Sequence, residues 1–214
     1  GYENENLIDS WFEKDGFIAV NENEDSLFSD DENAEVTAVF IKDKSRTGLR
    51  ALSSFITKKS LDFFCGAGEY LSALKSFGFV IRNDDDAKSV FELLNHYRIL
   101  CANRNGPLGT VEINKKVNAD VQSFLRASGK LNLRYDPEDF YPGKVILISR
   151  NDPFLNVDNG DVGFVAFDSE EGKKENRLKV FFPPKDRKTG DDSSFTDVRV
   201  ISPERLSDYG SGFA

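Results

Sequence analysis

The sequence contains no methionine, a single histidine and only two cysteines among 214 residues. The single histidine, His96, argues against a histidine-based catalytic triad and against a histidine-rich metal site. Cys65 and Cys101 are too few for a disulfide framework or a cysteine-rich metal site. We expect His96 to lie at the surface or boundary of a helix. Because a complete gene product begins with methionine, we interpret the chain as an internal fragment of a longer protein.

Other absences narrow the classes of function. No hydrophobic run reaches the length of a membrane span, and no signal peptide is recognisable, so we expect no membrane partner. ATP hydrolysis needs a Gly-Lys-Thr phosphate loop and an acidic Mg²⁺ ligand after a strand, and the sequence has neither. Its carboxylates show no pairing typical of a glycosidase or a nuclease. We therefore predict no catalytic residue, no metal site and no bound cofactor, and no ATP hydrolysis by the isolated chain.

The net charge of −9 is unevenly distributed along the chain. Residues 1–40 hold 12 Asp and Glu against one Lys, a net charge of −11, which leaves +2 for the remainder. Residues 98–134 hold seven Lys and Arg against two acidic residues, a net charge of +5. A basic segment beside an acidic one is compatible with a nucleic-acid path and a protein interface. Solvated helix faces explain the same pattern, and both interpretations stay open.

The spacing of apolar residues predicts a change of structure after Gly129. Before it we expect helices at 5–14, 49–61, 69–77 and 110–127. We expect one more helix that Asp84, Asp85 and Asp86 cap. We also expect strands at 17–20, 36–41 and 98–102, the first two separated by an acidic loop. After it, the strand-like runs are 144–149, 162–168, 177–182 and 197–201. Short, evenly spaced strands without helices indicate a small closed β-barrel.

Two polar loops carry most of the functional information. The first, residues 104–109, joins the predicted strand at 98–102 to the helix that begins near Thr110. The second, residues 150–161, joins two predicted strands and contains six Asn and Asp residues. Such side chains fold back onto backbone amides, and the Asn-Gly pair at 159–160 tolerates a positive φ. A well-formed hairpin explains this second loop as well as a binding site does.

Together the two loops resemble the RecD family, which comprises the alpha subunit of exodeoxyribonuclease V and stand-alone RecD-like helicases. The resemblance covers about residues 85–208, and residues 1–84 match only vaguely. It rests on four spaced motifs that occur in the family's order. They are Arg104, Gly106, Pro107 and Gly109 with Asn114 in the following helix; Phe140, Tyr141 and Gly143; Arg150, Asn151, Asp152, Asn159, Gly160, Asp161 and Gly163; and Pro203, Glu204, Arg205 and Leu206.

The resemblance implies an α/β fold with an all-β insert. Residues 85–139 would form part of the second RecA-like motor domain of a helicase, and residues 140–208 an inserted SH3-like barrel. Residues 1–84 are a poorly assigned α/β segment, and 209–214 a truncated return to the motor domain. The implied parent is a bacterial, cytoplasmic, ATP-dependent helicase that moves 5′→3′ on single-stranded DNA in double-strand-break repair and recombination. Its implied cofactors are ATP and Mg²⁺, and its implied partners are the beta and gamma subunits.

The site residues follow from the same two loops. A strand end before a Gly-Pro loop is where α/β folds place ligand groups, and amides at a helix N-terminus bind phosphate. The predicted DNA contacts are Arg104, Asn105, Thr110, Asn114, Lys115, Lys116, Arg150, Asn151 and Asn159. The predicted structural loop residues are Gly106, Pro107, Gly109, Gly143, Asp152, Gly160, Asp161 and Gly163. Base stacking or barrel packing explains Phe140, Tyr141 and Phe154 equally well.

Two other functions remain open. A non-catalytic module that binds nucleic acid or protein would need the same loops without ATP hydrolysis. More distantly, residues 62–68, Asp-Phe-Phe-Cys-Gly-Ala-Gly, resemble the cofactor motif of SAM-dependent cytosine-5 DNA methyltransferases. That family's catalytic Pro-Cys pair is missing, since neither Cys65 nor Cys101 follows a proline. The structural alternative for this segment is a joint between two helices.

Overall fold

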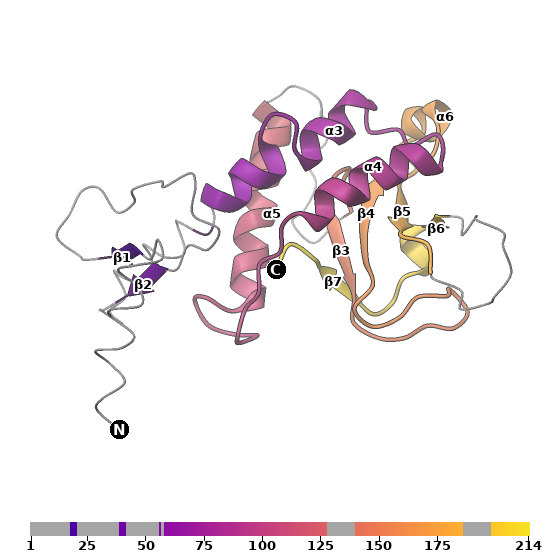
Figure 1. Ribbon diagram of the computed structural model, residues 1–214. Helices are drawn as coiled ribbons and strands as arrows, with labels where there is room; N and C mark the ends of the chain where they lie inside the picture. Colours follow the sequence, from indigo (N-terminus) through magenta and orange to yellow (C-terminus); the bar gives the residue numbers. More distant parts are fainter. Residues whose placement is uncertain (1–17, 21–38, 42–55, 57, 128–139, 186–197) are drawn as a thin grey trace, which may run out of the picture. The chain divides into compact units, whose positions relative to one another are not determined.

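The computed structural model (Figure 1) describes residues 18–20, 39–41, 56, 58–127, 140–185 and 198–214. The chain divides into two compact units, residues 1–56 and residues 57–214. In the first unit, β1 (Ile18–Val20) pairs in parallel with β2 (Val39–Ile41), where short strands were predicted. The predicted helix at 5–14, the acidic loop and most of the predicted helix at 49–61 lie outside the described residues.

The second unit begins with helices. Residues 58–65 are helical and are followed by α3 (Tyr70–Ser76), α4 (Asp84–Asn95) and α5 (Thr110–Ala127). These confirm the helices predicted from apolar spacing. The cap of α4 is Asn83, whose side chain accepts a hydrogen bond from the Asp86 amide. The three aspartates, predicted to cap the helix, instead fill its first turn, where carboxylates interact favourably with the helix dipole. His96 is exposed directly after α4, as expected.

The strand predicted at 98–102 is wrong. Residues 97–101 have no regular secondary structure, and Leu100 is 91% exposed. The Arg98 guanidinium donates hydrogen bonds to the Leu94 carbonyl at 2.9 Å and to the Asn95 side chain at 3.1 Å. These bonds satisfy groups at the C-terminal end of α4 and turn the chain around that end. Burial lowers the pKa of Arg98 from its ordinary value.

The rest of the unit is a five-stranded antiparallel sheet. Its strands are β3 (Val145–Ile148), β4 (Val162–Ala166), β5 (Lys179–Phe182), β6 (Arg199–Ile201) and β7 (Tyr209–Ser211), in the order β6-β5-β4-β3-β7. The first four confirm the predicted strands. The expectation of strands alone is wrong, because α6 (Glu170–Lys174) and the 3₁₀ helix η1 (Pro203–Arg205) interrupt them. β7 was not predicted.

The sheet is not closed, since β6 and β7 form its two ends in the described part of the chain. The SH3-like barrel, the RecA-like motor domain and the predicted domain boundaries therefore stay predictions. The boundary proposed between residues 208 and 209 falls inside this sheet, because Ser211 of β7 pairs with Ile146 of β3.

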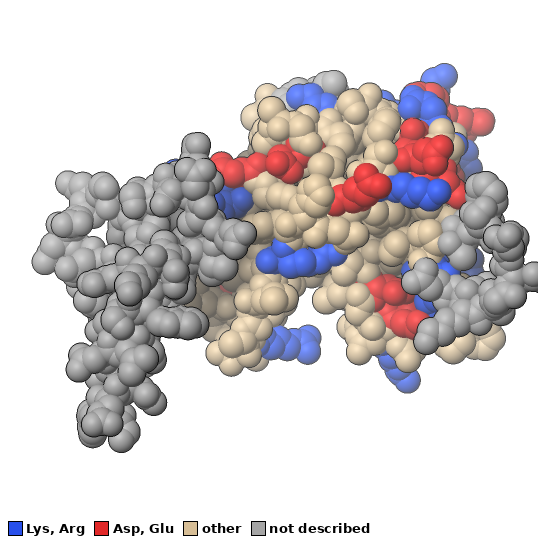
Figure 2. Space-filling view, in the orientation of Figure 1, with Lys and Arg blue, Asp and Glu red and all other residues tan. Residues whose placement is uncertain are grey.

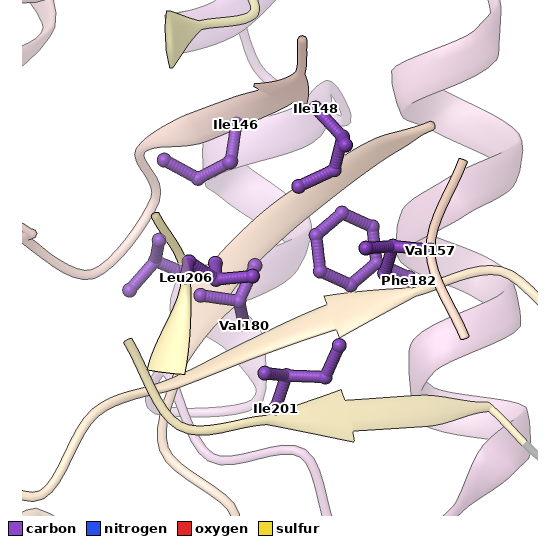
Figure 3. Close-up of a cluster of buried hydrophobic side chains, with 8 residues drawn as sticks. Ile146, Ile148, Val157, Val180, Phe182, Ile201 and Leu206 are labelled. Carbon is purple, nitrogen blue, oxygen red and sulfur yellow. The ribbon is translucent and has the colours of Figure 1, made fainter. Parts of the chain in front are cut away.

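Both faces of the sheet are buried. On one face, a cluster of eight apolar side chains fills the space under the connecting loops (Figure 3), namely Ile146, Ile148, Val157, Val165, Val180, Phe182, Ile201 and Leu206. On the other face, the Phe164 ring packs on Phe91 of α4 at 4.9 Å and on Phe181 at 5.3 Å between ring centroids. This alternation follows from the two-residue period of a strand. The helices therefore cover one face, and the opposite face is covered by loops (Figure 1).

Candidate nucleic-acid interface

The first polar loop, residues 104–109, and the preceding Asn103 fold onto the N-terminus of α5. The Asn103 carbonyl accepts from the Thr110 amide at 3.0 Å, and the Arg104 carbonyl accepts from the Val111 amide at 3.1 Å. Gly106 has a φ of +99°, a conformation that favours glycine. A Cβ at Gly109 would lie 2.7 Å from the Arg104 carbonyl oxygen. The two glycines thus let the loop close tightly on the helix, and the Arg104 side chain stays exposed.

This closure changes the expected role of the helix N-terminus. The amides of Thr110 and Val111 were expected to help bind a phosphate, but carbonyls of the loop already accept from both. The Thr110 hydroxyl also donates to the Asn103 carbonyl, at 3.4 Å. The loop therefore satisfies groups that every helix N-terminus leaves without partners. The amides of Thr110, Val111 and Ile113 thus have carbonyl partners, and an anion at this position would depend mainly on the side chain of Arg104.

Asn114 does not face solvent, contrary to its predicted role in DNA contact. It is 7% exposed, and its carboxamide donates to the Ala214 carbonyl and accepts from the Ala214 amide, each at 3.0 Å. One turn later, Asn118 donates to the Ser211 hydroxyl at 2.7 Å and accepts from the Tyr141 hydroxyl at 2.7 Å. These amides dock α5 on β7 and the segment that follows it. Burial raises the pKa of Tyr141 well above its ordinary value.

The described Lys and Arg side chains of the predicted basic segment, residues 98–134, differ in whether they already have partners within the protein. Among the described residues, no hydrogen bond or ion pair engages the side chains of Arg104 and Lys115, and both residues are exposed. Lys116 lies near Asp120 and lowers its pKa, although burial raises that pKa by more. Arg126 donates to Gln122 at 2.8 Å. On the face shown in Figure 2, Lys and Arg side chains alternate with Asp and Glu, so no continuous basic band crosses it.

The second polar loop joins β3 to β4 and is fixed by its own side chains. Asn151 accepts from the Asn159 amide at 2.7 Å. Asp152 accepts from the amides of Phe154 and Leu155, and it exchanges two backbone hydrogen bonds with Val157. This is how short polar side chains stabilise turns. Asn151 thus has a structural contact in addition to its predicted DNA contact, whereas no described partner engages the Arg150 side chain.

The remaining loop glycines and Asp161 fit the strands closely. Asp161 accepts from Arg199 at 2.8 Å and from the Asp158 amide at 2.9 Å. Gly160 has a φ of +95° in the turn. A Cβ at Gly163 would lie 2.5 Å from the Phe181 carbonyl oxygen, and one at Gly143 would lie 2.5 Å from a Leu71 methyl group. Arg199 of β6, which the sequence interpretation missed, connects β6 to this loop through its ion pair with Asp161.

Only one of the three aromatic candidates is accessible. Tyr141 is fully buried, and Phe140 packs against Tyr209 with 5.0 Å between ring centroids. Phe154 is 96% exposed at the tip of the second loop. Beside it lies a hollow of about 260 Å³, lined by residues 148, 150–155, 157 and 206–208. Sequence reasoning named Leu206 only as part of a motif and placed none of residues 206–208 in a site, because the 3₁₀ helix that precedes residues 206–208 has no periodic signature.

The two loops lie at the same end of the second unit. In Figure 1, the loop before α5 and the loop between β3 and β4 both extend from the lower end of the helices and sheet. Two segments that are almost fifty residues apart in the sequence therefore lie at the same end of this unit in this view.

The methyltransferase alternative does not fit the structure. Residues 61–65 are helical, so the glycines at 66 and 68 follow a helix where the cofactor motif needs a strand. The joint between two helices, which was the structural alternative, is what the structure shows. Burial, with the charge of Asp120 adding to it, raises the pKa of the Cys65 thiol to about 12, which disfavours the thiolate needed for nucleophilic attack.

No group of three or more His, Cys, Asp and Glu side chains in the described part of the chain is placed to hold a metal ion. No helix in that same part is long and apolar enough to cross a membrane.

Comparison with known proteins gives a partial similarity. No family model matches the chain. The chain is 34% identical over 79 residues to the RecBCD enzyme subunit RecD of Buchnera aphidicola subsp. Acyrthosiphon pisum, which is 36% of this chain and 12% of that subunit. It is 38% identical over 72 residues to the same subunit of Mycobacterium tuberculosis, which is 34% of this chain and 11% of that subunit. Over about a third of its length, the chain is therefore similar to RecD subunits of RecBCD enzymes.

Proposed function

We propose that this chain is part of an ATP-dependent DNA helicase related to RecD, and that it supplies contacts to single-stranded DNA. The partial similarity to RecD subunits supports the relationship. Such a parent protein would move 5′→3′ on single-stranded DNA during double-strand-break repair and recombination, either beside the beta and gamma subunits of exodeoxyribonuclease V or as a stand-alone enzyme. The sequence has no Gly-Lys-Thr phosphate loop, so ATP and Mg²⁺ would bind elsewhere in the parent.

One observation carries the DNA contact. Arg104 extends from a loop that two backbone hydrogen bonds and two glycines hold against α5. Its guanidinium has no partner among the described residues, and an arginine matches the geometry of a phosphate group. A phosphate contact of this kind fixes the position of a strand without reading its sequence. We expect Lys115, which is exposed in the first two turns of α5, to contribute in the same way.

The test is binding of a fluorescently labelled oligothymidylate, measured by anisotropy at several salt concentrations. Each phosphate contact on a single strand releases roughly 0.7 counterion, so Arg104→Ala should lower the salt slope by about that amount. The affinity should fall alike for all base compositions. Lys88→Ala is the matched control, because it removes one exposed positive charge from α4. Equal losses in both variants would mean that only net charge matters, and the proposed contact would be wrong.

A further inference from the structure

In the second loop, the exposed aromatic side chain of Phe154 is next in sequence to Leu155, which packs against the core. Phe154 is 96% exposed, whereas its neighbour Leu155 packs against the apolar cluster that includes Ile148 and Val157. Single exposed apolar side chains are common on protein surfaces, and Leu100 is also 91% exposed, so a role for Phe154 depends on the groups around it. The anchoring of Leu155 places the adjacent Phe154 outside the core.

Hydrogen bonds hold the backbone that carries this ring. Asp152 accepts from the amide of Phe154 at 2.9 Å and from the amide of Leu155 at 3.2 Å. The backbone groups of Asp152 and Val157 bind each other at 2.8 and 3.1 Å, which closes the loop at its base. A side chain on a rigid loop loses little conformational entropy when it binds a partner. The loop is therefore suited to presenting Phe154 as a contact residue.

The groups around Phe154 match the parts of a nucleotide. The hollow of about 260 Å³ beside the ring has room for a flat group. Arg150, at its edge, has no partner among the described residues and would bind a phosphate. Asp208 also lines the hollow, and its exposed carboxylate accepts a hydrogen bond from Ser207 at 3.1 Å. A carboxylate accepts from the exocyclic amines of adenine, cytosine and guanine but not from thymine, which has none, whereas every base has a face that stacks on an aromatic ring.

We propose that Phe154 and Arg150 form a site for one nucleotide of single-stranded nucleic acid, with the base on the Phe154 ring and the phosphate on Arg150. This inference rests on the proposed function, since it assumes that the chain binds single strands. It adds a contact to the base where Arg104 supplies a contact to the backbone. The two loops extend from the same end of the unit, so one extended strand can pass from one loop to the other (Figure 1). Every nucleotide carries a phosphate beside a flat ring, whereas a peptide offers this pair only where an acidic residue lies next to an aromatic one.

The first arm of the experiment uses the full 214-residue chain and the labelled oligothymidylate. Phe154→Ala should weaken binding by about 5-fold or more, the size expected for one stacked base, and should leave the salt slope unchanged. Phe154→Trp should retain the affinity. Arg150→Ala should lower the salt slope by roughly 0.7. Val200→Ala, which shortens another exposed apolar side chain, is the control and should change neither quantity.

The second arm separates the base from the backbone. An oligonucleotide with abasic sites throughout keeps every phosphate, so the wild-type chain should bind it as weakly as Phe154→Ala binds oligothymidylate. The Phe154→Ala variant should lose no further affinity on the abasic probe. If Phe154→Ala binds like the wild type while Arg104→Ala is weakened, the stacking site is wrong and the proposed function stands. If the wild type binds neither probe at low salt, both are wrong, and a protein would be the better candidate partner.

Discussion

The buried carboxamide of Asn118 gives the sharpest test of how α5 is attached to the sheet. Its amino group donates to the Asn114 carbonyl at 2.9 Å and to the Ser211 hydroxyl at 2.7 Å, and its oxygen accepts from the Tyr141 hydroxyl at 2.7 Å. Asn118 is 4% exposed and Tyr141 is fully buried. Replacement by alanine removes three hydrogen bonds from a site that solvent does not reach.

The expected cost of Asn118→Ala follows from these contacts. A buried hydrogen-bonding group that loses its partner costs about 1–3 kcal/mol, and each bond contributes about 1 kcal/mol net. We therefore expect the free energy of unfolding to fall by about 3 kcal/mol. Tyr141→Phe should cost about 1–2 kcal/mol, because it removes only the hydroxyl. In a double-mutant cycle the two losses should overlap by about 1 kcal/mol, since the residues share one hydrogen bond.

Urea unfolding followed by circular dichroism measures these differences, provided that all variants have the same slope with denaturant. Asn105→Ala is the matched control, because this asparagine is exposed in the loop before α5. Its unfolding free energy should change by less than about 0.5 kcal/mol. The reasoning fails if Asn118→Ala is no more destabilising than Asn105→Ala, because the amides of α5 would then contribute nothing to its attachment.

Two further variants test local features of the same unit. Gly143 has a φ of +91° and would place a Cβ 2.5 Å from a Leu71 methyl group, so Gly143→Ala should destabilise the fold by about 2–4 kcal/mol in urea titrations. Gly210→Ala, which meets open space, should cost far less. Burial raises the pKa of Asp120, so stability should fall as the pH rises from the ordinary carboxyl value through the raised one. Asp120→Asn should therefore melt above the wild type at pH 7 and closer to it at pH 4, and a constant difference would contradict this.

Sequence periodicity predicted the parts of the fold that are amphipathic over several turns. α5 begins and ends where the apolar spacing indicated, because Ile113, Val117 and Val121 recur on one buried face. The strand at 98–102 failed because an apolar run of that length has no period, and hydrogen bonds from Arg98 to the end of α4 decide its path. β7 is three residues long and was below the length at which alternation is visible.

The sequence predicted which loops form the candidate site, but not which of its side chains are exposed and which are buried. Gly106 and Gly109 carry a steric requirement that the sequence already indicated. The burial of Asn114 was missed, although Asn114, Asn118 and Gln122 recur every four residues beside the apolar stripe. That row of amides was a signal for a polar contact with backbone from elsewhere in the chain. The partner, Ala214, lies 100 residues away, and no local pattern could have identified it.

The closed loop before α5 limits how tightly a phosphate of a nucleic-acid strand could bind at this helix N-terminus. Because the Thr110 and Val111 amides are already occupied, a phosphate near this helix would find no rigid ring of donors of the kind that locks an anion in place. It would meet the long, rotatable side chain of Arg104. A contact through a flexible side chain tolerates small shifts of the nucleic-acid strand. It also breaks and forms again with a small change in free energy. For the proposed contact to single-stranded DNA, this predicts weak binding to one phosphate and easy exchange between neighbouring phosphates.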